Sequence, residues 1–150
     1  MTDHAFEFLD AVDTFARSVR RARGTGVTTA RHGLTLSQYG LLLPLLDASE
    51  ARVRELADTA GVAPATATNI LDALQRRGIV ARDRARHDRR AVTVTLTPRG
   101  RALLDARHAA TRERERSMYD SLNRHERALA PGLLYRLAAL IDELAALDAD

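Results

Sequence analysis

Arginine dominates the chemistry that this chain can offer. Residues 76–101 contain nine arginines and only two acidic residues, whereas the formal net charge of all 150 residues is only +3. Guanidinium groups bind phosphate and carboxylate through charge-assisted hydrogen bonds. A basic block in an otherwise slightly acidic chain is typical of a nucleic-acid binder. We therefore expect this block to meet nucleic acid rather than to be an ordinary solvated surface.

Other kinds of reactive site have little support. The chain has no cysteine, which excludes disulfides, thiolate metal sites and thiol redox sensing. Its five histidines never stand four residues apart, and the sequence contains no phosphate-binding P-loop, no nucleophile elbow and no zinc-protease motif. We expect no enzymatic activity, no cofactor and no metal site.

The elements around the arginines can be read from spacing. Residues 64–77 are expected to form a helix, because Pro64 suits a first helical turn and Gly78 suits the position just past the end. Residues 79–82 fit a short strand, and the alternation of apolar residues with threonine over 92–96 predicts a second one. Between the strands, residues 83–90 are expected to be a polar hairpin loop. This order is that of a winged helix.

The helix over residues 64–77 has one core face, since Ile70, Leu71 and Leu74 recur at helical spacing. Small or polar residues remain for the outer face: Ala65, Thr66, Thr68, Asn69, Asp72, Arg76 and Arg77. The first half of such a recognition helix reads base edges in the major groove. Asn69 can pair with adenine through two hydrogen bonds, or it can simply face solvent. The residues expected to contact DNA are Ala65, Thr66, Thr68, Asn69 and Arg76.

Three arginines of the expected loop, Arg86, Arg89 and Arg90, are candidates to enter the flanking minor groove. A narrow AT-rich groove concentrates negative potential, which attracts guanidinium groups. Asp88 is too close to them to help DNA binding by its own charge. We expect it to orient Arg90 through a charge-assisted pair.

Five more helices are expected, over residues 3–23, 35–47, 51–60 and 98–121 and after Asn123, with a short turn at 28–32. Thr35 with Gln38, and Asn123 with Glu126, are expected to cap the starts of two of them. Pro44 should kink or shorten the second helix, and Pro131 should kink or break the last one. Leucines at positions 133, 137, 140, 144 and 147 form a heptad-like seam that is too short for a free coiled coil. Packed against the first helix of a second copy, this seam would form a dimer interface.

Three consecutive motifs resemble those of the MarR-type transcription regulators: Gly61-Val62-x-Pro64-x-Thr66-x-Thr68, Leu74-x-x-x-Gly78-Ile79-Val80-x-Arg82 and Asp88-x-Arg90-x-Val92-x-Val94-x-Leu96-Thr97-x-x-Gly100. The resemblance implies one domain over residues 1–150, mainly α with a small β-wing. In it, residues 35–100 would form the winged helix-turn-helix lobe, and residues 1–34 and 101–150 the N- and C-terminal dimerisation helices.

The resemblance also implies a function. It describes a homodimeric repressor that binds double-stranded DNA at an inverted-repeat operator and is released by a small anionic or aromatic effector. Phe15, His32 and Tyr39 lie near the expected effector cleft, although a packed core explains Phe15 and Tyr39 equally well. The main alternative is a constitutive or architectural DNA-binding protein without an effector, and an interaction module that does not bind DNA is disfavoured by the arginines.

The sequence gives no sign of a membrane partner. The first residues lack the basic start and apolar run of a signal peptide, and no stretch approaches 18 apolar residues. We therefore expect a cytoplasmic protein.

Overall fold

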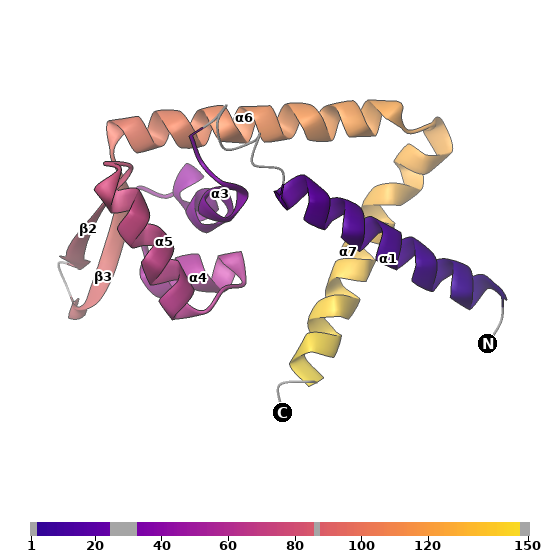
Figure 1. Ribbon diagram of the computed structural model, residues 1–150, viewed down its shortest axis with the longest axis horizontal. Coiled ribbons are helices and arrows are strands. Elements are labelled where there is room, and N and C mark those ends of the chain that lie inside the picture. Colours follow the sequence, from indigo (N-terminus) through magenta and orange to yellow (C-terminus); the bar gives the residue numbers. More distant parts are fainter. Residues whose placement is uncertain (1–2, 25–32, 86–87, 148–150) are drawn as a thin grey trace. The chain divides into compact units, whose positions relative to one another are not determined.

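A computed structural model describes residues 3–24, 33–85 and 88–147, and the chain divides into two compact units, residues 1–108 and 109–150. The fold is mainly helical with one small sheet, as predicted (Figure 1). The elements of the first unit are α1 (Asp3–Gly24), α3 (Leu36–Leu42), the 3₁₀ helix η1 (Leu43–Leu46), β1 (Glu50–Arg52), α4 (Val53–Ala60), α5 (Pro64–Arg76), β2 (Val80–Ala85) and β3 (Asp88–Leu96). Helix α6 (Pro98–Ser121) continues into the second unit, which also holds α7 (Arg124–Leu147). The turn expected at residues 28–32 lies outside the described residues.

The start and end of α3 follow from local chemistry. The Gln38 backbone N–H donates to Thr35 Oγ1 at 3.1 Å, and the Thr35 N–H donates to Gln38 Oε1 at 2.9 Å. This reciprocal pair is the predicted capping box. The α-helix ends at Leu42, and Pro44 lies in the first turn of η1. Since proline has no N–H and crowds the preceding turn, it shortens the helix as predicted.

The sheet has three antiparallel strands in the order β1-β3-β2, one more strand than the sequence predicted. The helix predicted over residues 51–60 begins only at Val53, and residues 50–52 form β1 instead. Ala51 is 8% exposed and pairs with Val94, while its two neighbours are exposed. Three residues are too few to show the alternation that predicts a strand. Pairing with the edge of β3 is therefore what makes this segment a strand.

The wing is more regular than predicted. The ladder between β2 and β3 extends from Val80 opposite Leu96 to Ala85 opposite Asp88, with an irregularity between Arg84 and Ala85. The expected loop over residues 83–90 is therefore mostly strand, and only residues 86–87, which the structure does not describe, separate the two strands. Strand pairing overrides the polar composition of this segment.

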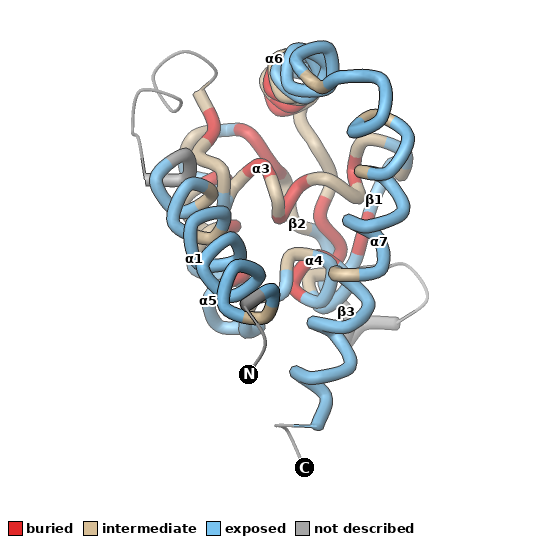
Figure 2. Tube along the Cα trace, turned by 90° about the vertical axis from the view of Figure 1, so that its right-hand side faces the viewer, coloured by how far each residue is buried: buried red, intermediate tan, exposed pale blue. Residues whose placement is uncertain are grey.

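The core lies in the winged-helix part of the first unit, where Figure 2 shows most of the buried positions. From α5 it receives Leu71 and Leu74, as predicted, together with Ala67, while Ile70 is only partly buried. Other buried apolar residues come from every neighbouring element: Leu34, Leu41, Leu42, Leu45, Leu56, Ile79, Val80, Val94 and Leu104. This core fixes α5 against α3, α4 and the sheet.

The junction between β3 and α6 is unusually close to the turn that follows α5. Thr97 Oγ1 donates to the Gly78 carbonyl oxygen at 2.7 Å, and the Gly100 N–H donates to Thr97 Oγ1 at 3.0 Å. A Cβ on Gly100 would lie 1.9 Å from the Ile79 carbonyl oxygen. Only glycine fits there without a backbone shift, so this contact ties the base of the wing to α6.

In the second unit, Asn123 and Glu126 cap α7 as predicted. The Asn123 N–H donates to Glu126 Oε2 at 2.8 Å, and the Glu126 N–H donates to Asn123 Oδ1 at 3.0 Å. The predicted interruption at Pro131 does not break the helix, because α7 runs unbroken from Arg124 to Leu147. A proline removes only its own N–H from the ladder, and the turns on either side keep theirs.

None of the helices among the described residues is long and apolar enough to cross a membrane.

Candidate nucleic-acid interface

Helices α4 and α5 form the predicted helix-turn-helix. Gly61 ends α4 in the left-handed conformation, with φ of 62°. Its N–H donates to the Asp58 carbonyl oxygen at 3.1 Å, and the Val62 N–H donates to the Ala57 carbonyl oxygen at 3.0 Å. Glycine adopts this conformation without a steric penalty. The turn therefore directs the chain from the supporting helix into α5.

Helix α5 presents a narrow exposed stripe opposite its buried face. Ala67, Leu71 and Leu74 are buried, and a period of 3.6 residues places Ala65, Asn69 and Arg76 on the opposite side. All three are exposed, and so are Thr66 and Thr68. The predicted DNA-contacting residues of α5 are thus accessible, and Ala65, Asn69 and Arg76 share one line along the helix.

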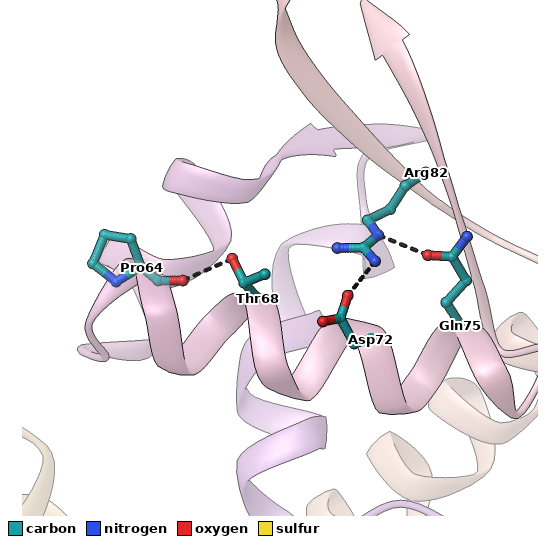
Figure 3. Close-up of polar contacts among 5 residues, drawn as sticks. All are labelled: Pro64, Thr68, Asp72, Gln75 and Arg82. Carbon is teal, nitrogen blue, oxygen red and sulfur yellow. Dashed lines mark hydrogen bonds and ion pairs between the residues drawn. The ribbon is translucent and has the colours of Figure 1, made fainter.

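A second side of α5 faces the wing, where Arg82 of β2 reaches across to it (Figure 3). Arg82 Nε donates to Gln75 Oε1 at 2.8 Å, and its guanidinium also forms an ion pair with Asp72. Asp72, expected on the outer face, is instead half-buried because this pair holds it against the wing. The network fixes the first strand of the wing to the C-terminal half of α5.

Thr68 lies on the same side of α5 (Figure 3). Its hydroxyl donates to the Pro64 carbonyl oxygen at 3.0 Å, one turn earlier in the helix. While that bond is made, the hydroxyl proton is unavailable to a phosphate. Thr68 can still offer its methyl group or accept a hydrogen bond.

Part of the arginine block binds the protein itself. Arg77, expected on the outer face, is turned inward: its guanidinium donates to the Gly33 carbonyl oxygen and, at 3.3 Å, to Gln38 Oε1. Arg99 donates to the Arg77 carbonyl oxygen at 3.0 Å, and Arg101 donates to the Leu46 carbonyl oxygen at 3.2 Å. Sequence reasoning missed these roles because the acceptors come from distant segments.

The wing residues are only partly described. Asp88, Arg89 and Arg90 belong to β3 rather than to a loop. Their side chains, and all of Arg86, lie outside the described part, so the expected pair between Asp88 and Arg90 stays a prediction. The backbone places all three at the tip of the β2–β3 hairpin.

An open hollow of about 650 Å³ lies where α4, α5 and the wing meet. Its lining residues are Arg52, Val53, Arg54, Asp58, Pro64, Thr68, Arg82 and Val92. The sequence had not singled out Arg52 and Arg54. Two arginines close together at the start of the supporting helix could have drawn attention to this site. They were passed over because they lie outside the basic block of residues 76–101.

The residues expected near an effector cleft have contrasting environments. Tyr39 is 6% exposed, its hydroxyl shares a hydrogen bond with His108 Nδ1 at 2.9 Å, and the Arg107 guanidinium carbon lies 5.8 Å from its ring centre. Phe15 is 63% exposed. His32 lies outside the described residues. The burial of Tyr39 favours the packed-core explanation for that residue.

Across the described residues, no group of three histidine or acidic side chains is placed to hold a metal ion.

Known proteins share both this fold and parts of this sequence. The MarR family model matches residues 34–92. The HTH-type transcriptional repressor NicR of Pseudomonas putida is 36% identical over 109 residues, which make up 73% of this chain and 67% of NicR. The chain belongs to the MarR family. The resemblance carried by the three motifs is therefore confirmed.

Other relatives of this MarR-family chain agree. The HTH-type transcriptional repressor YetL of Bacillus subtilis is 37% identical over 78 residues, 51% of this chain and 47% of YetL, so the chain spans about half the length of that relative. The solved structure of the transcriptional repressor CouR, bound to a 23-mer DNA duplex, has a TM-score of 0.70 and 30% identity, covering 83% of this chain and 89% of that chain. These relatives are transcription regulators.

The fold as a whole is also shared. The MarR family regulator SP03579 has a TM-score of 0.84 at 22% identity, and the match covers 97% of both chains. At this identity the likeness concerns the fold, and it confirms the predicted winged-helix architecture.

Proposed function

We propose that this MarR-family protein is a homodimeric, sequence-specific DNA-binding repressor. The observation that carries the proposal is the exposed stripe of Ala65, Asn69 and Arg76 on the second helix of a helix-turn-helix, beside an arginine-bearing wing. A helix of this kind enters the major groove, and arginines on a wing fit the minor groove beside it. Residues 35–100 form the DNA-binding lobe, and residues 1–34 and 101–150 serve dimerisation.

The proposed residue roles follow from chemistry. Asn69 reads a base edge, and Arg76 binds phosphate or a base further along the groove. Ala65, Thr66 and Thr68 allow close approach and contact the backbone or a thymine methyl group. Arg86, Arg89 and Arg90 enter the flanking minor groove, with Asp88 orienting Arg90.

Dimerisation is supported by apolar surface that one chain leaves uncovered. On α1, Phe6, Phe8, Leu9, Val12 and Phe15 are exposed, and on α7 Leu133, Leu140, Leu144 and Leu147 are exposed. Exposed apolar surface of this extent is typical of an interface. A two-fold dimer would place two copies of α5 on inverted half-sites roughly 34 Å apart.

Release by a small anionic or aromatic effector is the remaining part of the proposal, with Phe15, His32 and Tyr39 near the binding cleft. Tyr39 is buried and its hydroxyl is bonded to His108, as a core residue would be. The alternative is a constitutive or architectural DNA-binding protein without an effector. Titration of the protein–DNA complex with phenolic carboxylates separates the two. Release at a defined ligand concentration supports the effector, and an unaltered complex supports constitutive binding.

Selection of bound fragments from a random-sequence DNA pool tests the main proposal. An inverted repeat should be enriched, because a symmetric dimer reads the same half-site twice. Enrichment without symmetry would contradict the dimeric arrangement, and failure to retain any DNA would contradict the function itself. Binding should also weaken steeply as salt is raised, through counterion release.

A further inference from the structure

We propose that Arg52, the last residue of β1 and the N-cap of α4, and Arg54, in the first turn of α4, bind backbone phosphates of the duplex that α5 enters. They would form a third DNA contact beside the recognition helix and the tip of the wing. The inference rests on the proposed function, since it concerns how the same DNA is held.

The first support is location. Both arginines line the hollow together with Pro64 and Thr68 of α5 and with Arg82 of the wing. A ligand that fills this hollow therefore touches α4, α5 and the sheet at once. A nucleic-acid strand passing over the helix-turn-helix would meet all three elements.

The second support is availability. The Arg54 side chain is 89% exposed, and its Nε lies 4.0 Å from Asp58 Oδ2 in a pair that is itself exposed. Exposed ion pairs of this kind contribute little to stability, so the guanidinium can leave Asp58 for a phosphate. Arg52 is also exposed. Its bond to Glu55 Oε2, at 2.8 Å, comes from the backbone N–H and does not use the guanidinium group. Arg77, Arg99 and Arg101 contrast with both, since they bind backbone carbonyl oxygens.

The third support is charge. Three arginines and one carboxylate, Asp58, line the hollow. Because Arg82 is already paired with Asp72, Arg52 and Arg54 are the arginines of the hollow that can meet a phosphate. The start of α4 adds the partial positive charge of the helix dipole, which favours anions, although Glu55 in the first turn already accepts from the Arg52 N–H. In a helix-turn-helix the first helix crosses the phosphate backbone while the second lies in the groove. Positive charge at the start of α4 therefore matches phosphate and carries no preference for a base.

The test compares Arg52→Gln and Arg54→Gln with Arg124→Gln, which removes the same charge from an exposed position at the start of α7. Binding is measured by fluorescence anisotropy over a range of salt concentrations, with two duplexes. One is a fragment recovered by selection from a random pool, and the other has a mixed sequence. Circular dichroism establishes that each variant is folded.

We expect each α4 variant to bind about five- to tenfold more weakly at about 0.1 M salt, by the same factor on both duplexes. The salt slope should fall by about one for every bond between an arginine and a phosphate that the substitution removes. Arg124→Gln should match the wild type. Arg54→Lys should restore most of the binding, because a phosphate contact needs charge more than a planar fork.

Two results would overturn the inference while leaving the proposed function intact. One is unchanged affinity and salt slope in both α4 variants, when the wild type binds DNA. The other is a loss of affinity confined to the selected duplex, which would mean that these arginines read bases. If the wild type binds neither duplex, the proposed function fails and the inference fails with it.

Discussion

Individual arginines in this protein divide into two groups that the sequence does not distinguish. Arg77, Arg82, Arg99 and Arg101 donate to acceptors of the protein itself, while Arg76 is exposed on α5. A guanidinium has five N–H donors and serves carbonyl groups as readily as phosphate. The basic block is therefore partly a means of holding the lobe together.

The link between Asp72 and Arg82 can be measured by a double-mutant cycle. Asp72→Ala and Arg82→Ala should each destabilise the protein, and the double variant should lose less stability than the sum of the two. We expect a coupling of about 1 kcal/mol in the free energy of unfolding, because the pair is only partly buried. Urea denaturation provides the measurement, and strictly additive effects would show that the wing is not tied to α5 through this pair.

Asn69 is expected to carry sequence discrimination. Asn69→Ala should reduce the preference for the selected operator over a single-base variant by about 1–3 kcal/mol. Arg76→Gln is the matched comparison on the same exposed stripe. If Arg76 binds phosphate, this change should lower the affinity for the selected operator and for the single-base variant by the same factor. Competition binding with a panel of single-base operator variants measures this preference for each protein. An unaltered preference in Asn69→Ala would assign this side chain to solvent.

Among the elements, the wing depends on contacts with its two neighbours. Arg82 joins β2 to α5, while Thr97 and Gly100 join the start of α6 to the turn after α5. These contacts fix the base of the hairpin on two sides. The base of the wing is therefore held by packing within the lobe.

Gly100→Ala tests this arrangement. The new methyl group would overlap the Ile79 carbonyl oxygen, so the backbone must move, and we expect a loss of about 2–3 kcal/mol in stability. Gly40→Ala is the control, because Gly40 lies within α3 with no atom near the added methyl group. That change should stabilise the helix by up to about 1 kcal/mol. Thermal unfolding of both variants gives the comparison, and equal melting temperatures would argue against the close contact.

The whole molecule is expected to be complete only as a dimer. Four of the five leucines in the apolar seam of α7 are exposed in the single chain, and Leu137 is partly exposed. Leu144→Glu should raise the dimer dissociation constant by about a hundredfold or more, since burying an unpaired carboxylate costs about 3 kcal/mol or more. DNA affinity should fall with it, because one lobe then reads one half-site.

Ala146→Glu is the control for that experiment, because it adds the same charge about half a turn away on the same exposed helix. It should leave the dimer intact. Analytical ultracentrifugation distinguishes the two variants. A Leu144→Glu protein that remains dimeric would remove this seam from the interface.

Local sequence determined much of the fold. The recognition helix, the capping box at Thr35, the alternation along β3 and the cap at Asn123 all follow from neighbours within a few residues. Such signals act within one turn or one strand, so they can be read before the chain is folded. The motifs around the wing were also sufficient to indicate the MarR family.

Tertiary structure alone decided the rest. Strand β1 exists because the edge of β3 is available to three residues that have no strong preference of their own. Arg77 faces inward because the Gly33 carbonyl oxygen, far away in sequence, lies beside it after folding. Arg52 and Arg54 join the hollow for the same reason. Partners in hydrogen bonding and packing are chosen by proximity in space, and that proximity is created only when the core closes.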